Sequence, residues 1–149
     1  MIYGYCRVST QSQNIERQVR NILAVFPDAE IIREVYTGTT FQGRDKLEKL
    51  LKKVRMDDTI VFDSVSRMSR SAEEGFALYQ HLFNMGVHLV FLKEPHINTD
   101  TYRKALAAKV ELTGDKVDFI LVGVNQYLME LAKEQIRIAF EQSQKEVDD

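Results

Sequence analysis

Short apolar runs alternate along this chain with segments whose apolar residues recur every three or four positions. The first pattern favours a buried strand and the second an amphipathic helix. The apolar runs lie near residues 2–8, 31–35, 59–62 and 87–92, and a helical pattern follows each of them. Strands separated by helices join a mainly parallel sheet. The sequence therefore predicts an α/β domain of three layers, with a mainly parallel central sheet of four to five strands flanked by helices.

Local signals mark where several helices begin and end. Thr10 with Gln13, and Ser71 with Glu74, match the capping box that starts a helix. Gly86 is suited to end the helix that begins after Ser71, because glycine readily adopts the left-handed conformation that follows many helices. Two glycines and several threonines between residues 36 and 43 predict a mobile loop before the second helix.

The C-terminal part of the chain predicts a short helix at 101–112 and a long one from Asp115 to about Glu146. About thirty helical residues span roughly 45 Å, which exceeds the diameter of a domain of this size, so part of the helix must project. Its first half is apolar nearly all round, and we expect it to mediate oligomerisation. The predicted organisation is a core at residues 1–115 and the long helix at 116–149, both in one domain.

Composition excludes several classes of protein. A chain of 149 residues with 44% apolar content is long enough for one core. It has no apolar stretch of about 20 residues and no secretory segment at its start, so we expect a cytoplasmic protein without a membrane span. A single cysteine, Cys6, and three histidines without paired spacing predict neither a disulfide nor a metal site. The net charge of −2 argues against DNA binding over the whole surface, so any DNA contact is local, shared between subunits or supplied elsewhere.

Polar side chains gather where two of the predicted strands end. Alternation along the first strand places Tyr5, Arg7 and Ser9 on one face, and Arg67 and Arg70 follow the third strand. Residues at the carboxyl ends of parallel strands surround the ligand crevice of such sheets, and arginine suits the capture of phosphate. A hydroxyl among arginines suggests attack on a phosphate.

These residues, in this order and spacing, resemble the catalytic domain of the serine site-specific recombinases, which include resolvases and DNA invertases. The resemblance covers nearly the whole chain. It is carried by Tyr5-x-Arg7-x-Ser9-Thr10, Gln18, Thr37-Gly38, Arg44, Arg67-x-x-Arg70 and Glu134.

The resemblance implies a role for each residue. Ser9 would attack a DNA phosphodiester to form a 5′-phosphoserine and free a 3′-hydroxyl, with no metal or nucleotide cofactor. Further roles are implied for the phosphate-binding arginines Arg7, Arg67 and Arg70, for Arg44 on its loop, for Tyr5 in the site, and for the supporting residues Gln18, Glu34 and Glu134.

The resemblance also implies partners. These are a double-stranded DNA recombination site, a homodimer formed through the long helix, and a synaptic homotetramer in which strands are exchanged and rejoined. In the family this helix leads to a separate DNA-binding domain. No helix-turn-helix or zinc pattern follows it here, so the chain is expected to be the catalytic part of a longer recombinase.

Three departures qualify the resemblance. Ser66 stands where many resolvases have an aspartate, so an essential carboxylate at that position is excluded. The Glu-Arg pair of the family's long helix is Glu134-Gln135 here, which weakens a phosphate role at position 135. The segment from Pro95 to Asp115 is longer than in small resolvases and favours the large integrase or conjugative-transposon branch.

Simpler interpretations remain open for the same residues. Ser9 could cap the first helix, and Arg67 and Arg70 could form surface ion pairs with Glu73 or Glu74. At the level of the whole chain, one alternative is a catalytically silent DNA-binding or assembly module with the same fold. The other is a nucleotide- or phosphate-binding domain, although neither glycine-rich phosphate-loop motif is present.

Overall fold

The structure is a computed structural model that describes residues 1–8, 15–35, 44–69, 71–113 and 118–148, with the backbone alone described at 109–113, 118–124 and 143–148. In this part of the chain, one sheet of four parallel strands has the order β2-β1-β3-β4. The strands are β1 (Ile2–Val8), β2 (Glu30–Val35), β3 (Thr59–Phe62) and β4 (His88–Phe91). The predicted α/β class is confirmed, with the smaller of the two expected strand numbers.

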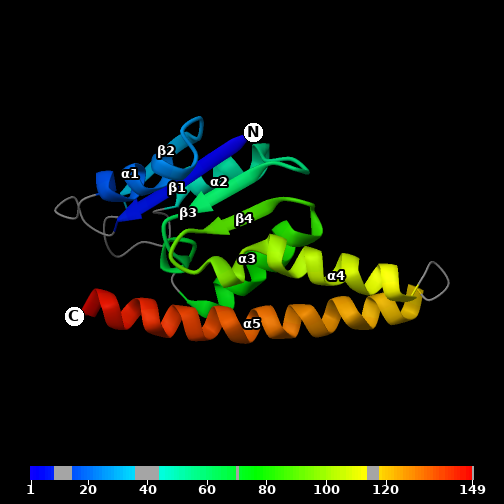
Figure 1. Ribbon diagram of the computed structural model, residues 1–149. Coiled ribbons are helices and arrows are strands. Elements are labelled where there is room, and N and C mark those ends of the chain that lie inside the picture. The colour runs from blue at the N-terminus through cyan, green and yellow to red at the C-terminus, as the bar shows by residue number, and fades with distance from the viewer. Residues whose placement is uncertain (9–14, 36–43, 70, 114–117, 149) are drawn as a thin grey trace.

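Helices connect the strands and cover the sheet (Figure 1). They are α1 (Ile15–Val25), α2 (Asp45–Lys53), α3 (Ala72–Asn84), α4 (Thr99–Thr113) and α5 (Asp118–Asp148), with single 3-10 turns at η1 (Val65–Arg67) and η2 (Pro95–Ile97). The Ser71 side chain accepts a hydrogen bond from the Glu74 amide, so this predicted capping box is confirmed. Gly86 has a φ of +80° just after α3, as expected of a residue that ends a helix. The capping box at Thr10, the loop at 36–43 and the cap at Asp115 lie outside the described residues.

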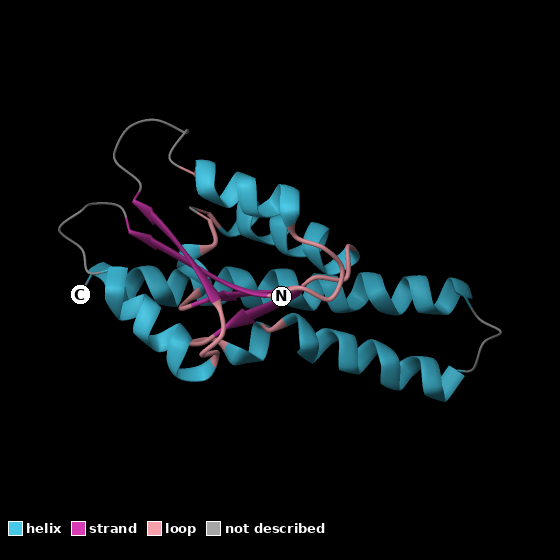
Figure 2. Cartoon of the chain, turned by 90° about the horizontal axis from the view of Figure 1, so that it is seen from above, coloured by secondary structure: helices cyan, strands magenta, loops and turns pink. Residues whose placement is uncertain are grey.

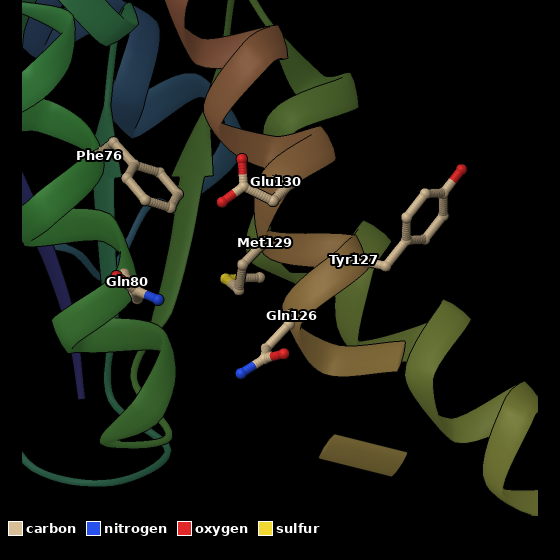
Figure 3. Close-up of a pocket in the computed structure, with 6 residues that line it drawn as sticks. All are labelled: Phe76, Gln80, Gln126, Tyr127, Met129 and Glu130. Atoms are coloured by element: carbon tan, nitrogen blue, oxygen red, sulfur yellow. The ribbon is translucent and has the colours of Figure 1, made fainter. Parts of the chain in front are cut away.

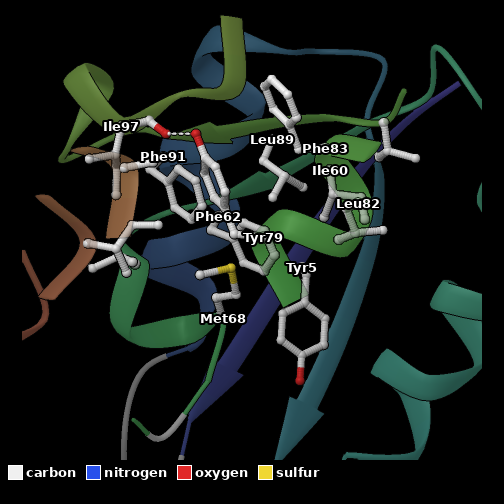
Figure 4. Packing of buried hydrophobic residues seen from close by; sticks show 14 of the residues in the cluster. Tyr5, Ile60, Phe62, Met68, Tyr79, Leu82, Phe83, Leu89, Phe91 and Ile97 are labelled. Carbon is white, nitrogen blue, oxygen red and sulfur yellow. Dashed lines mark hydrogen bonds between the residues drawn. The ribbon is translucent and has the colours of Figure 1, made fainter. Parts of the chain in front are cut away.

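The two faces of the sheet have separate cores. Alternate residues of β1 point to opposite sides, so Tyr3 and Tyr5 join the larger core with α2, α3, α4 and α5, whereas Cys6 packs against α1. In the larger core the Phe62 and Phe91 rings stack with centroids 5.3 Å apart, and Tyr79 from α3 stacks on Phe91 (Figure 4). The aromatic stack therefore joins β3, β4 and α3 directly beneath the carboxyl edge of the sheet.

The outer edge of β4 is closed by side chains. Thr99 Oγ1 accepts from the Leu89 amide at 2.8 Å, and Asn98 Oδ1 accepts from the Phe91 amide at 2.7 Å. These groups replace a fifth strand, because they satisfy backbone donors that an open edge would expose. The strand β4 is one residue shorter at each end than the predicted run, and the next helix begins at Thr99, two residues earlier than expected.

The helices α4 and α5 form an antiparallel pair that extends beyond the sheet (Figures 1 and 2). The long helix α5 runs along the face of the domain formed by α3 and η1, and its N-terminal half continues past the core beside α4. The expectation of a long projecting helix is confirmed. In the part of the chain that is described, no helix is both long and apolar enough to cross a membrane.

Candidate active site

Tyr5 and Glu34 meet under the carboxyl edge of β1 and β2. The Tyr5 hydroxyl donates to Glu34 Oε1 at 2.5 Å, and both side chains are buried. Glu34 also accepts from the backbone amides of Lys46 at 2.9 Å and Leu47 at 3.4 Å, in the first turn of α2. Burial, and then the bond to the Glu34 carboxylate, raise the pKa of Tyr5 well above its usual range. Glu34 thus joins Tyr5 to the start of α2, where Arg44 lies.

Gln18 holds the backbone of Arg7 at the end of β1. Its Oε1 accepts from the Arg7 amide at 3.0 Å, and its Nε2 donates to the Arg7 carbonyl at 2.9 Å. The neighbouring strand β3 ends at Phe62, which lies opposite Tyr5, so it does not reach Arg7. The buried Gln18 amide therefore acts as a substitute strand partner and fixes the backbone from which the Arg7 side chain projects.

Backbone carbonyl groups of the loop after β3 accept hydrogen bonds from two guanidinium groups. Arg7 Nη2 donates to the Ser66 carbonyl at 2.8 Å and to the Ser69 carbonyl at 3.4 Å. Arg44 Nη2 donates to the carbonyl of Met68 and, at 3.5 Å, to that of Arg67. Side chains from β1 and from the start of α2 thus converge on the segment that carries Arg67.

The site is electropositive. Desolvation and the nearby charges of Arg44 and Arg67 lower the pKa of Arg7 to about 10, so its guanidinium still carries a proton at neutral pH. Arg44 Nε and Arg67 Nε are buried and have no hydrogen-bond partner among the described residues. Buried donors without partners are rare in proteins, and these two belong to arginines whose positive charges already act on Arg7. Such a place suits an anion with several oxygen atoms, for which arginine is the preferred ligand.

The described cluster does not account for every sequence-predicted residue. Ser9 and Arg70 lie outside the described residues. Glu134 is on the exposed side of α5, where it pairs with Arg137, and among the described residues no contact links it to Arg7 or Arg44. The surface ion pairs considered for Arg67 are not found in the described part of the chain.

Two buried carboxylates near the ends of β3 and β4 were not predicted to matter. Asp63 accepts a hydrogen bond from Asn21 at 2.9 Å and forms an ion pair with Lys93, on the α1 side of the sheet. Glu94 accepts a hydrogen bond from the Val65 amide at 2.6 Å and so binds the first residue of η1. In the sequence, Glu94 directly precedes a proline, and no site role was predicted for it. A carboxylate directly after a buried strand was the available signal, because such groups are rarely buried without a partner.

Comparison with known proteins decides the family. A model of the resolvase N-terminal domain matches residues 2–146. The chain belongs to the resolvase family. Among curated resolvases, that of transposon Tn21 from Escherichia coli is 36% identical over 93 residues, covering 61% of this chain and 46% of the relative. That of Clostridium perfringens (strain 13 / Type A) is 29% identical over 100 residues, covering 66% and 52%. That of transposon Tn1546 from Enterococcus faecium is 27% identical over 146 residues, covering 96% and 70%.

This resolvase-family chain spans about half the length of the Tn21 and Clostridium perfringens resolvases. Its fold is similar to that of a resolvase family site-specific recombinase from Streptococcus pneumoniae, with a TM-score of 0.53, 21% identity, and coverage of 99% of this chain and 98% of that one. It is also similar to the N-terminal catalytic domain of TP901-1 integrase, with a TM-score of 0.50, 21% identity, and coverage of 87% and 97%. The predicted resemblance to serine recombinases is thereby confirmed at the level of family and fold.

Proposed function

We propose that this chain is the catalytic domain of a serine site-specific DNA recombinase. The observation that carries the proposal is the convergence of Arg7, Arg44 and Arg67 at the carboxyl edge of the sheet, with two buried Nε donors unpartnered among the described residues. Resolvase family membership supplies the substrate class, a DNA phosphodiester. Ser9 follows Arg7 by two residues in the sequence, and we assign it the role of nucleophile.

The proposed reaction is an in-line transesterification. The Ser9 Oγ–phosphorus bond forms and the bond from phosphorus to the 3′ oxygen breaks, while the proton of the serine hydroxyl leaves and the departing 3′ oxygen gains one. Arg7, Arg67 and Arg70 stabilise the non-bridging oxygens, and Arg44 adds its charge from the start of α2. Losing one such donor typically costs about 2.7–4 kcal/mol of transition-state stabilisation. The reverse attack by a 3′-hydroxyl reseals the strand without a nucleotide cofactor.

The remaining predicted residues have supporting roles in this proposal. Gln18 positions the Arg7 backbone, and Glu34 joins Tyr5 to the helix that begins beside Arg44. Glu134 belongs to the surface of α5 in the described arrangement, so we assign it a role only in the assembled complex.

Assembly through α5 is part of the proposal. A cavity of about 550 Å³ lies between α3 and α5, and Figure 3 shows Phe76 and Met129 on its two sides. Beside it Tyr127 is 64% exposed and Leu131 is 40% exposed, which are high values for large apolar side chains in the described chain. We propose that these residues contact a second copy in a homodimer and then in a synaptic tetramer on double-stranded DNA. The domain division at residues 115 and 116 follows the same proposal, with the long helix as the assembly element.

Covalent trapping on DNA tests the function. Sheared DNA from the genome that encodes the protein is incubated with tagged protein, the mixture is denatured, and DNA that stays attached to the protein is recovered and sequenced. We expect one recurring sequence, lost in Ser9→Ala and retained in the control Ser143→Ala. Recovery that is equal for wild type and Ser9→Ala would contradict the assignment of Ser9. Sequence-specific DNA binding without any adduct would support the catalytically silent module instead.

A further inference from the structure

Glu94 is a buried carboxylate that contacts the arginine-bearing loop through the backbone of Val65. It follows β4, is 9% exposed, and accepts a hydrogen bond from the Val65 amide at 2.6 Å. Val65 is the first residue of η1 and is itself fully buried. Burying a carboxylate costs free energy of desolvation unless the group is hydrogen-bonded. The bond from the Val65 amide, 29 residues away in the sequence, offsets part of that cost for Glu94.

The turn that Glu94 holds carries the acceptors of the site. The Val65 carbonyl accepts from the Met68 amide at 3.0 Å, and the Ser64 carbonyl accepts from the Arg67 amide at 3.1 Å, so η1 is a single hydrogen-bonded unit. The carbonyls on this unit bind the Arg7 and Arg44 guanidinium groups. A displacement of Val65 would therefore displace Arg67 and the two guanidinium groups together.

Glu94 is well suited to anchor this unit because its own backbone is fixed. Its amide donates to the Phe91 carbonyl at 3.2 Å, and its carbonyl accepts from the Ile97 amide at 3.1 Å. The Ile97 carbonyl in turn accepts from the Tyr79 hydroxyl at 2.8 Å (Figure 4). The following residues are bonded to the edge of β4, as described above. The anchor therefore rests on β4 and α3.

We propose that Glu94 is a positioning residue that fixes η1, and through it Arg67 and the carbonyls that hold Arg7 and Arg44. This inference rests on the proposed function for its meaning in catalysis. In the described part of the chain, Glu94 acts on the site through the backbone of Val65.

Two substitutions separate positioning from general stability. Glu94→Gln keeps an oxygen that accepts from the Val65 amide, whereas Glu94→Met has a similar length and no strong acceptor. Glu30→Met is the matched control, because Glu30 is exposed at the opposite edge of the sheet, where its partner is Lys53. The thermal midpoint of each variant is measured to verify folding.

Amide and guanidinium Nε signals in ¹⁵N-resolved NMR spectra of the whole chain give a readout that needs no catalysis. We expect the Val65 amide and the Nε signals of Arg7, Arg44 and Arg67 to shift in Glu94→Met and to stay close to wild type in Glu94→Gln and Glu30→Met. Titration with inorganic phosphate should then show weaker binding for Glu94→Met alone. Arginine signals and phosphate affinity that are unchanged in a folded Glu94→Met protein would overturn the proposal.

Adduct formation on the trapped DNA sequence gives the catalytic readout. We expect Glu94→Met to slow it by about tenfold to a hundredfold, because small misplacements of catalytic groups have effects of that size, while DNA affinity stays within about threefold. Glu94→Gln should recover most of the rate. Equal rates in Glu94→Met and wild type would refute the positioning role, and equal losses in Glu94→Gln and Glu94→Met with unmoved arginine signals would reduce Glu94 to a structural residue. If wild type forms no adduct at all, the proposed function fails, and the NMR and phosphate measurements still decide the role of Glu94.

Discussion

The hydrogen bond between Tyr5 and Glu34 supplies a quantitative test of how this site is built. Both side chains are buried, and the hydroxyl and carboxylate oxygens are 2.5 Å apart. Hydrogen bonds to charged groups contribute about 1.5–3 kcal/mol net, roughly twice the value for neutral pairs. The other carboxylate oxygen of Glu34 is bonded to the Lys46 amide, so it holds the carboxylate in place when the tyrosine hydroxyl is removed.

A double-mutant cycle isolates this bond. We expect Tyr5→Phe and Glu34→Gln each to lower the free energy of unfolding by about 1.5–3 kcal/mol, and the double variant to lose less than the sum by a similar amount. For a chain of this length, a loss of about 2 kcal/mol corresponds to a fall of roughly 4–8 °C in thermal midpoint. Urea unfolding of the four proteins at neutral pH gives the coupling energy.

A second cycle serves as the control. Tyr102 is nearly as buried as Tyr5 but lies on α4, remote from Glu34, so Tyr102→Phe and Glu34→Gln should be additive to within about 0.3–0.5 kcal/mol. A coupling between Tyr5 and Glu34 no larger than that of this control would refute the view that the pair ties β1 to the start of α2.

Two further predictions concern stability. Burial raises the pKa of the Cys6 thiol from 9.0 to about 12, so the unfolded state loses its proton first and the free energy of unfolding falls as pH rises above about 9. Between pH 8 and 10 this group alone removes about 1.4 kcal/mol, which urea unfolding should detect and Cys6→Ala should reduce; a stability that is flat over this range would contradict it. Gly75 on α3 lies where an added Cβ would come within 2.9 Å of Phe140 on α5 and 2.7 Å of Ser69 Oγ. Gly75→Ala should therefore destabilise by about 1–3 kcal/mol despite its better helix propensity, as thermal or urea unfolding would show. The control Ala77→Gly, at an exposed position of the same helix, should cost only about 0.5–1 kcal/mol, and a stabilised Gly75→Ala protein would show that α5 can move aside.

The periodicity of the apolar residues was sufficient to predict the layers of this fold. The strand Ile2–Val8, the strand Thr59–Phe62 and the cap at Ser71 were placed correctly because local patterns decide them. The closing of the outer edge of β4 by the side chains of residues 98 and 99 was not predicted. Such contacts join a strand to residues that follow it in the sequence, so the apolar pattern of the strand itself does not predict them.

The site was predictable in part for the same reason. Strand alternation brought Tyr5 and Arg7 to one face, and the structure places them so. It did not indicate that Gln18 would bind the Arg7 backbone or that Glu94 would hold Val65, since each bond joins distant segments. A polar residue that is buried by tertiary contacts looks in the sequence like any exposed polar residue.

The binding of the Arg7 and Arg44 side chains by loop carbonyls has a consequence for the thermodynamics of DNA recognition. A free arginine side chain loses about 1.5–2 kcal/mol of rotamer entropy when it is ordered. Here the rotamer entropy of these side chains is already lost when the protein folds. Phosphate binding therefore orders few side chains that were mobile before it. The affinity of the site for phosphate should then depend weakly on temperature through side-chain entropy and strongly on ionic strength, because screening of charge remains the main variable term.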